Sequence, residues 1–274
     1  MKHRKKLSVA VLLFLACLSL SIYGRSLWHP IYVFVVGGRT VQEAVDQFQK
    51  NAESRLRPHF HTAQINFPPQ ELTLIGLKEE KQLELWAKND EGWKLIHTYP
   101  ILAASGSAGP KLREGDRQVP EGMYRIAGLN PNSSYHLSMK LNYPNRIDRH
   151  YAELEGRTEP GSNIFIQGKD LSIGCLAMGD SAIEELFVLV HLVGMQNVNI
   201  LIAPHDVRKR SLFPVPESLP KWTTKLYESI ETEFKSYDKS AQGVQIDFVS
   251  SADDSVLGNR RAFSRTYGAT NRPR

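Results

Sequence analysis

The chain has 274 residues, of which 41% are hydrophobic and 23% are charged. These values are ordinary for a globular protein and suit one catalytic domain with modest extensions. The formal net charge of +5 is mild and spread along the chain. Basic and aromatic residues do not alternate as in a surface that stacks bases, so we expect no nucleic-acid partner. No His, Cys and Asp residues have metal-ligand spacing, so we expect no metal and no cofactor.

The first 24 residues have the layout of an export signal. Basic residues from Lys2 to Lys6 precede an uncharged apolar run at 7–23. This pattern predicts a secretory signal peptide or a short N-terminal membrane anchor, and Cys17 adds lipidation as a further alternative. A run of about 17 residues is at the lower limit for a spanning helix, so these alternatives stay open. Leading basic residues favour export of the remainder, and we expect a periplasmic, secreted or anchored protein of the cell envelope.

Residues 25–68 are predicted to form a membrane-proximal segment followed by a helix. The aromatic and β-branched run at 31–36, closed by Gly37 and Gly38, suits a membrane-proximal stretch or a short strand. Thr40 and Glu43 have the spacing of a capping box, so we expect a helix from 40 to about 56 that ends before Pro58. Its apolar residues recur at helical spacing, which predicts packing against the main domain.

Residues 69–206 are predicted to form a mainly β domain with flanking α-helices, either a β-sandwich or an open barrel. Short strands are expected at 72–77, 82–88, 93–103, 122–127 and 134–141, with turns at 89–92 and 130–132. After a polar loop at 145–161 we expect a strand at 164–166, a helix at 181–193 capped by Asp180, and a last strand at 197–203. Residues 207–274 should contain an amphipathic helix at 221–234 and a basic, disordered tail.

Cys175 is the only cysteine outside the N-terminal run, so no disulfide is expected within the exported part. It follows Gly174 on a turn, and a thiol placed there can present its sulfur beside backbone N–H groups. A nucleophile and donors for a developing oxyanion are the parts that cysteine acyl transfer needs. A buried small hydrophobe is the alternative interpretation of a lone cysteine.

Four segments of the chain, in order, resemble the L,D-transpeptidase (YkuD-type) catalytic domain over roughly residues 70–205. They are Gly109-Pro110-Lys111 with Gly115-Asp116, Pro120-Glu121-Gly122-Met123-Tyr124, Leu141-Asn142-Tyr143-Pro144-Asn145, and Ser172-Ile173-Gly174-Cys175. Within the family, the stretch after the cysteine is similar to the YafK-like branch. The resemblance implies an L,D-transpeptidase-like fold and an enzyme that acts on peptidoglycan stem peptides through a thioester on Cys175, by acyl transfer or by hydrolysis.

One position departs from the family pattern. Where the resemblance implies a histidine as general base, this chain has Gln167. A carboxamide does not accept a proton near neutral pH, whereas an imidazole does. The alternative function is therefore a catalytically impaired pseudoenzyme that binds muropeptides or a cell-wall synthesis complex.

Further residues near the cysteine are candidates for supporting roles. Ser172 is expected to hold the turn by a hydrogen bond to the backbone. Gly168 and Gly174 are expected where the backbone conformation, or the close approach of another group, favours a residue without a side chain, and the N–H region of Cys175 is the candidate oxyanion donor. His150, in the polar loop, is the favoured substitute base, with a solvated histidine as the alternative. Three arginines of the same loop suit the carboxylates of a stem peptide or form a solvated charged surface: Arg146, Arg149 and Arg157.

Overall fold

The computed structural model describes residues 25–172 and 174–238. They belong to the first of two units into which the chain divides, 1–242, while the second unit, 243–274, lies outside them. The predicted signal or anchor at 1–24 and the predicted basic tail also lie outside the described residues. Within the described part, no helix has both the length and the apolar character needed to span a bilayer.

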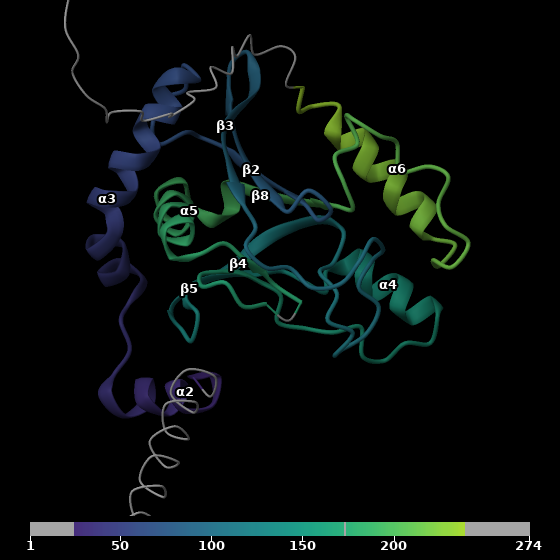
Figure 1. The fold of residues 1–274 in the computed structure, drawn as a ribbon, viewed down its shortest axis with the longest axis horizontal. Coiled ribbons are helices and arrows are strands. Elements are labelled where there is room, and N and C mark those ends of the chain that lie inside the picture. The colour runs from purple at the N-terminus through teal and green to yellow at the C-terminus, as the bar shows by residue number, and fades with distance from the viewer. Residues whose placement is uncertain (1–24, 173, 239–274) are drawn as a thin grey trace, which may run out of the picture. The chain divides into compact units, whose positions relative to one another are not determined.

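A mixed sheet of eight strands organises the described residues (Figure 1), in the order β3-β2-β1-β8-β4-β5-β6-β7. The strands are β1 (Leu72–Leu77), β2 (Gln82–Asn89), β3 (Gly92–Pro100), β4 (Gly122–Ser133), β5 (His136–Leu141), β6 (Phe165–Gln167), β7 (Leu176–Ala177) and β8 (Val198–Ala203). The helices are α2 (Arg25–Val36), α3 (Val41–Thr62), α4 (Arg146–Leu154), α5 (Asp180–Val193) and α6 (Thr223–Phe234), with a 3₁₀ turn η1 (Met195–Asn197). The predicted class, mainly β with flanking helices, is confirmed.

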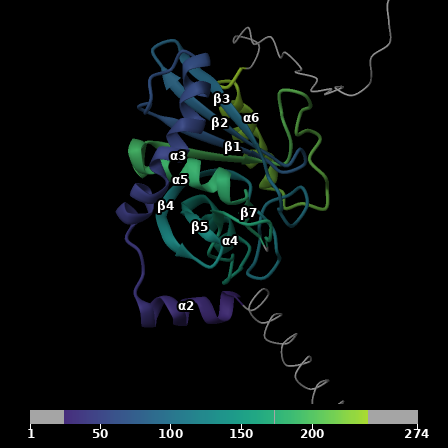
Figure 2. The same ribbon diagram turned by 60° about the vertical axis from the view of Figure 1, so that its left-hand side comes forward.

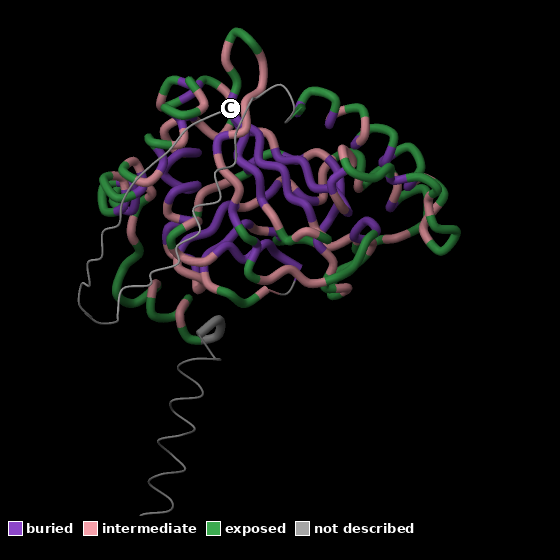
Figure 3. Tube along the Cα trace, turned by 45° about the horizontal axis from the view of Figure 1, so that its top comes forward, coloured by how far each residue is buried: buried purple, intermediate pink, exposed green. Residues whose placement is uncertain are grey.

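The two faces of the sheet carry separate hydrophobic cores. Strand β1 alternates, so that Leu72 and Leu74 pack with α3 and α5 whereas Ile75 and Leu77 pack with α6. Because β1 and β8 are the parallel central strands, they are buried on both faces and contain long apolar runs (Figure 3). Helices α3 and α5 lie side by side, and α6 is separated from them by the sheet (Figure 2).

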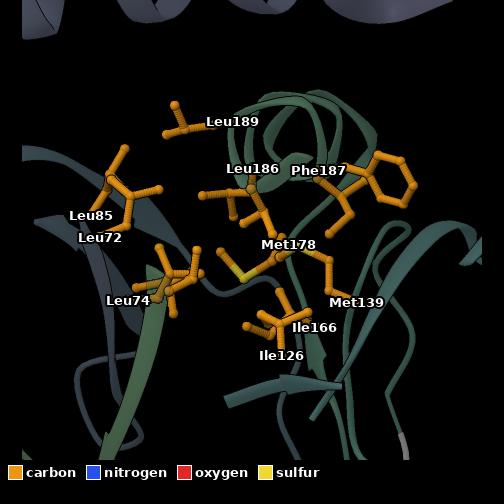
Figure 4. Packing of buried hydrophobic residues seen from close by; sticks show 14 of the residues in the cluster. Leu72, Leu74, Leu85, Ile126, Met139, Ile166, Met178, Leu186, Phe187 and Leu189 are labelled. Carbon is orange, nitrogen blue, oxygen red and sulfur yellow. The ribbon is translucent and has the colours of Figure 1, made fainter. Parts of the chain in front are cut away.

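The core beneath α5 joins both halves of the sheet. Figure 4 shows Leu186 and Phe187 of α5 close to side chains from β1, β4, β5 and β6, with Met178 between them. Met178 follows β7 directly, so the strand that comes after Cys175 is anchored in this core. Burial of this kind stabilises the fold by about 1.5–3 kcal/mol for each large apolar side chain.

Several predicted elements are confirmed, and the N-terminal ones need correction. The strand at 72–77 and the helix at 181–193 agree with β1 and α5 within one residue, and α6 agrees with 221–234 within two. Residues 25–36 form a helix rather than a strand. Helix α3 begins at the predicted capping box but continues through Pro58 to Thr62, because Phe60 is buried in the core and offsets the hydrogen bond that proline cannot make.

Three further predictions in the second half of the domain are wrong. Strand β4 runs through Pro131 to Ser133, because irregular pairing between Asn130 and Ser133 accommodates the proline. The predicted loop at 145–161 contains α4, whose capping box is formed by Asn145 and Asp148. Asp180 does not cap α5, since its carboxylate accepts a hydrogen bond from the Lys169 backbone N–H at 3.0 Å and pairs with the Lys169 ammonium at 2.5 Å.

Gly168 lies where the chain leaves β6 and passes under the start of α5. A Cβ atom at this position would lie 2.6 Å from the carbonyl oxygen of Tyr135 and 2.8 Å from Oδ1 of Asp180. The first of these atoms belongs to the backbone, so it cannot rotate away as a flexible side chain would. Any side chain at this position therefore pushes β6 away from β5 or from the first turn of α5.

We expect Gly168→Ala to lower the free energy of unfolding by about 1–3 kcal/mol, the usual cost of overpacking. Gly128→Ala is the matched control, because nothing lies within 4 Å of a Cβ atom there and the change should have little effect. Urea unfolding of both variants measures the difference. Equal stabilities would show that the contact at Gly168 relaxes without cost.

Candidate active site

Cys175 immediately precedes β7, a two-residue strand held in parallel against β6. The register pairs Ile166 with Leu176 and Gln167 with Ala177. Side chains two residues apart on a strand point to the same face, and Cys175 and Gln167 both line one pocket of about 310 Å³. The structure therefore brings together the cysteine and the residue that replaces the expected base.

The lining of this pocket is polar and nearly free of charge. Asn130, Ser138 and Gln167 stand opposite one another on β4, β5 and β6. The other lining residues besides Cys175 are Ser133, Ser134, Tyr135, Asn163 and Phe165. Apart from the Tyr135 phenol and the thiol itself, none of the described lining residues carries an ionisable side chain. Such a surface can donate and accept hydrogen bonds, but it holds no ordinary general base near neutral pH.

Gln167 is 4% exposed, and its carboxamide is held in place. Its Nε2 atom donates to the carbonyl oxygen of Leu171 at 2.9 Å. This bond spans the turn that leads from β6 toward the cysteine. Gln167 thus has a structural contact of its own and leaves its carbonyl oxygen as the group available to a ligand.

Two serine hydroxyls accept hydrogen bonds from backbone N–H groups of the cysteine turn. Ser172 Oγ accepts from the Cys175 N–H at 3.0 Å and donates to the Cys175 carbonyl oxygen. Ser105 Oγ accepts from the Gly174 N–H at 2.6 Å and donates to the Arg117 carbonyl oxygen at 2.7 Å. Gly174 has φ +86°, which a residue with a side chain rarely adopts. The N–H groups expected to receive an oxyanion are present but hydrogen-bonded within the protein.

Burial raises the pKa of the Cys175 thiol, although a backbone hydrogen bond at Phe165 and the charge of Lys111 act in the opposite direction. The residue is 8% exposed, and its Sγ atom lies 3.9 Å from the carbonyl oxygen of Asn163. An unperturbed thiol is already mostly protonated at neutral pH. A raised pKa makes the reactive thiolate still scarcer.

Lys111 is the nearby positive charge, and it is almost fully buried. Its ammonium group donates to Asp116 Oδ1 at 2.5 Å and to the Arg113 carbonyl oxygen at 2.9 Å. Burial raises the pKa of Asp116, but hydrogen bonds from Lys111 and three backbone N–H groups outweigh it and lower the pKa overall. Asp116 stays ionised and neutralises much of the Lys111 charge, which limits how far that charge can favour a thiolate.

A buried ion pair holds the 109–121 part of the loop that carries both Ser105 and Lys111. Lys78 Nζ donates to Glu121 Oε1 at 2.9 Å and to the carbonyl oxygens of Gly109 and Val119. Glu121 Oε1 also accepts from the Gly109 N–H, and its Oε2 accepts from the Tyr227 hydroxyl of α6. Burial lowers the pKa of Lys78, against the opposing effect of Glu121. Gly109 and Val119 of this loop are thus fastened to the residue that follows β1 and, through Glu121 and Tyr227, to α6.

Sequence reasoning missed the roles of Ser105, Lys111 and Lys78. Lys111 belongs to the Gly109-Pro110-Lys111 segment that resembles the family, but the sequence assigned no role to its side chain. Ser105 lies in a small-residue loop at 104–109 that gave no chemical signal. Their contacts join segments far apart in the sequence, and no local pattern encodes such contacts.

The predicted substitute base and the predicted arginines do not line the Cys175 pocket. His150 and Arg146 lie on α4 and line a different pocket of about 590 Å³. Arg149 and Arg157 line a third pocket of about 520 Å³, which includes Ser162. Arg157 is bonded to the Leu112 carbonyl oxygen and paired with Glu155. In the described part of the chain, no three His, Cys, Asp or Glu side chains gather closely enough to hold a metal ion.

A protein-family model matches the part of the chain that holds this pocket. Residues 73–200 match the family model of the L,D-transpeptidase catalytic domain, YkuD. Residues 73–200 are thus similar to the L,D-transpeptidase catalytic domain, as the sequence motifs indicated. That family acts on peptidoglycan stem peptides.

Particular relatives cover only part of the chain. A protein of Escherichia coli K12 named "Putative L,D-transpeptidase YafK" is 36% identical over 132 residues, or 46% of this chain. The match covers 51% of that relative, so the chain spans about half the length of the curated relatives it matches. Among solved structures, the helical cell shape determining protein Pgp2 from Campylobacter jejuni is 20% identical, with a TM-score of 0.41, over 54% of this chain and 55% of that one. Bd1075 from Bdellovibrio bacteriovorus is 22% identical, with a TM-score of 0.38, over 51% and 50%.

We expect alkylation of Cys175 by iodoacetamide to rise about tenfold per pH unit through neutral pH and to level off at a higher pH than for an ordinary thiol. The reason is that only the thiolate reacts and the pKa is raised. Mass spectrometry of a Cys17→Ser chain measures the rate. The matched control carries Ser229→Cys, an exposed thiol on α6, in a Cys17→Ser, Cys175→Ser background. If the rate for Cys175 levelled off at a lower pH than the rate for the control thiol, a group near the sulfur would be lowering its pKa.

Proposed function

We propose that the Cys175 pocket binds a peptidoglycan stem peptide and that Cys175 accepts its acyl group as a thioester. The observation that carries this proposal is the shared pocket, in which the sulfur and the Gln167 carboxamide lie among other amide and hydroxyl side chains. Neutral hydrogen-bonding groups suit a peptide backbone, which offers amide donors and acceptors. The family of the domain supports the choice of substrate.

In the proposed step, Sγ of Cys175 attacks the carbonyl carbon of the amide that joins an L-centre to a D-amino acid. The C–S bond forms, the C–N bond breaks, and the D-amino acid leaves as an amine that gains the proton lost by the thiol. The acyl group then passes to another amine or to water, which gives transpeptidation or hydrolysis. Gln167 would orient the substrate through its carbonyl oxygen rather than move a proton.

The proposed reaction is slow at neutral pH. A general base typically contributes about 10²–10⁴ to the rate, and Gln167 supplies none. The backbone N–H groups of Gly174 and Cys175 must also exchange their serine partners for the oxyanion before they can stabilise it. Both features favour a second candidate, in which the same pocket binds muropeptides, or a cell-wall synthesis complex, without turnover.

The remaining assignments complete the proposal. We place the protein in the cell envelope, with residues 1–24 as signal peptide or anchor, 25–68 as a membrane-proximal part, 69–206 as the catalytic domain and 207–274 as a C-terminal extension. Arg149 stays a candidate for a substrate carboxylate, because its pocket includes Ser162, the neighbour in sequence of Asn163 in the Cys175 pocket.

We expect intact-protein mass spectrometry, after incubation with a tetrapeptide muropeptide, to show an adduct of one acyl group that hydroxylamine removes. Cys175→Ala should show no adduct but should still bind the muropeptide, since the other lining residues are unchanged. Binding without any adduct in the unaltered protein would establish the second candidate. Absence of binding in both proteins would contradict the first candidate and the muropeptide-binding form of the second.

We expect Gln167→His to raise the rate of adduct formation at pH 7 by about tenfold or more, because an imidazole there restores a base beside the thiol. Gln167→Ala is the control, since it removes the same bond to the Leu171 carbonyl oxygen without supplying a base. It should give no gain. Equal rates for the two variants would show that position 167 is not the base position.

A further inference from the structure

Helix α2 exposes an unusual amount of apolar surface. Phe34 is 90% exposed, Val35 74% and Ile31 65%, and Trp28, Tyr32 and Val36 are also exposed. No Asp, Glu, Lys or Arg occurs between Ser26 and Gly38. Contiguous apolar surface of this kind marks a site of interaction with another molecule or with a membrane.

The apolar residues surround the helix instead of forming a stripe. Residues 31–36 are all apolar or aromatic, and six consecutive residues pass more than once around an α-helix. A second copy of the chain, or a partner helix, would cover one face and leave the opposite face in water. A helix that is apolar on all sides is suited to an environment that surrounds it. Lipid supplies such an environment, and the uncharged apolar run at 7–23 lies just before α2 in the same chain.

The length and composition of α2 match the interface of a bilayer better than its centre. Twelve residues extend about 18 Å, which is short of the roughly 30 Å hydrocarbon core. Trp28 and Tyr32 pack edge to face, with ring centroids 6.3 Å apart. These two residue types favour the headgroup level, where the ring is apolar and the N–H or O–H stays wet.

The chain fastens α2 close to the Cys175 pocket. Arg39 is joined to Asn132 by two hydrogen bonds, N–H to Oδ1 at 2.8 Å and Nδ2 to the carbonyl oxygen at 2.7 Å. Its guanidinium also donates to the Pro131 carbonyl oxygen at 2.7 Å. Asn130 and Ser133, on the same stretch of β4, line the pocket. Only Gly37 and Gly38 lie between Val36 and Arg39, so the Cα atom at the end of α2 is within about 11 Å, three Cα–Cα steps, of this anchoring point in any orientation.

We propose that α2 inserts into a bilayer at the boundary of the headgroups and the acyl chains, where lipid surrounds it, and thereby holds the rim of the Cys175 pocket at the membrane surface. The pocket would then meet peptide that lies close to the membrane. This inference does not depend on whether Cys175 turns over a substrate. It concerns residues that the chemistry of the site does not use.

The test uses the full chain, with Cys17→Ser and Cys175→Ser, in vesicles of phosphatidylethanolamine and phosphatidylglycerol. A nitroxide label is placed at Phe34→Cys on α2, at Ser134→Cys on the pocket rim, or at Ser229→Cys on α6 as control. With vesicles, the label at 34 should gain collisions with oxygen and lose collisions with a soluble nickel chelate several-fold. A nickel-chelating lipid should relax the label at 134 several-fold more than the label at 229.

Two outcomes at the label on residue 34 would overturn the proposal. One is a label at 34 that stays as accessible to the soluble chelate with vesicles as without them. The other is a label that is already protected without lipid because the protein self-associates, which would assign the surface to a second copy.

A variant with Phe34→Glu and Val35→Glu distinguishes the effect of α2 from any anchoring by residues 1–24. These side chains are exposed, so the fold should persist, and the label at 134 should lose its relaxation by the nickel lipid. Unchanged relaxation would show that α2 does not set the position of the pocket.

Discussion

The ion pair between Lys78 and Glu121 fastens the part of the structure on which the candidate site depends. It joins Lys78, which directly follows β1, to Gly109 and Val119 in the loop at 101–121 and, through Tyr227, to α6. Both side chains are buried, and removal of one partner from such a pair costs about 3–5 kcal/mol because the other is left unpaired. The loop in turn supplies Ser105 to the turn of Cys175 and Lys111 to its surroundings. The conformation of the cysteine turn therefore rests on a charge pair in another part of the chain.

The chemistry of the pocket follows from what surrounds the sulfur. Burial and a neutral lining disfavour the thiolate, and Asp116 neutralises much of the one buried cation that would favour it. The same neutral lining is well suited to the amide groups of a peptide. A site of this composition binds its ligand more readily than it activates its nucleophile, which is why recognition and slow acylation are proposed together.

The β4 strand connects the two proposals. Its last residues line the Cys175 pocket, and the same stretch holds Arg39 at the start of the chain that follows α2. Irregular pairing around Pro131 makes this possible, because it frees backbone and side-chain groups that a regular ladder would occupy. One segment thus forms a wall of the pocket and the attachment point of an apolar helix.

The sequence by itself determined the features that short patterns encode. These include the capping box of Thr40 and Glu43, the strand at 72–77, the helix after Cys175, and the motifs that resemble the domain family. They were predictable because the residues involved are close together in the chain and their periodicity is local. The substitution at Gln167 was also visible, because the motif fixes its place relative to Cys175.

Tertiary structure alone decided which side chains share a site. The parallel pairing of β6 with β7 puts Gln167 and Cys175 in one pocket, whereas His150 and the three arginines line other pockets. Contacts such as Ser105 with Gly174 join residues 69 positions apart. The path of α3 through Pro58 and of β4 through Pro131 was likewise set by long-range packing and pairing that outweigh local preference. Such contacts depend on how distant segments meet, and a linear pattern does not carry that information.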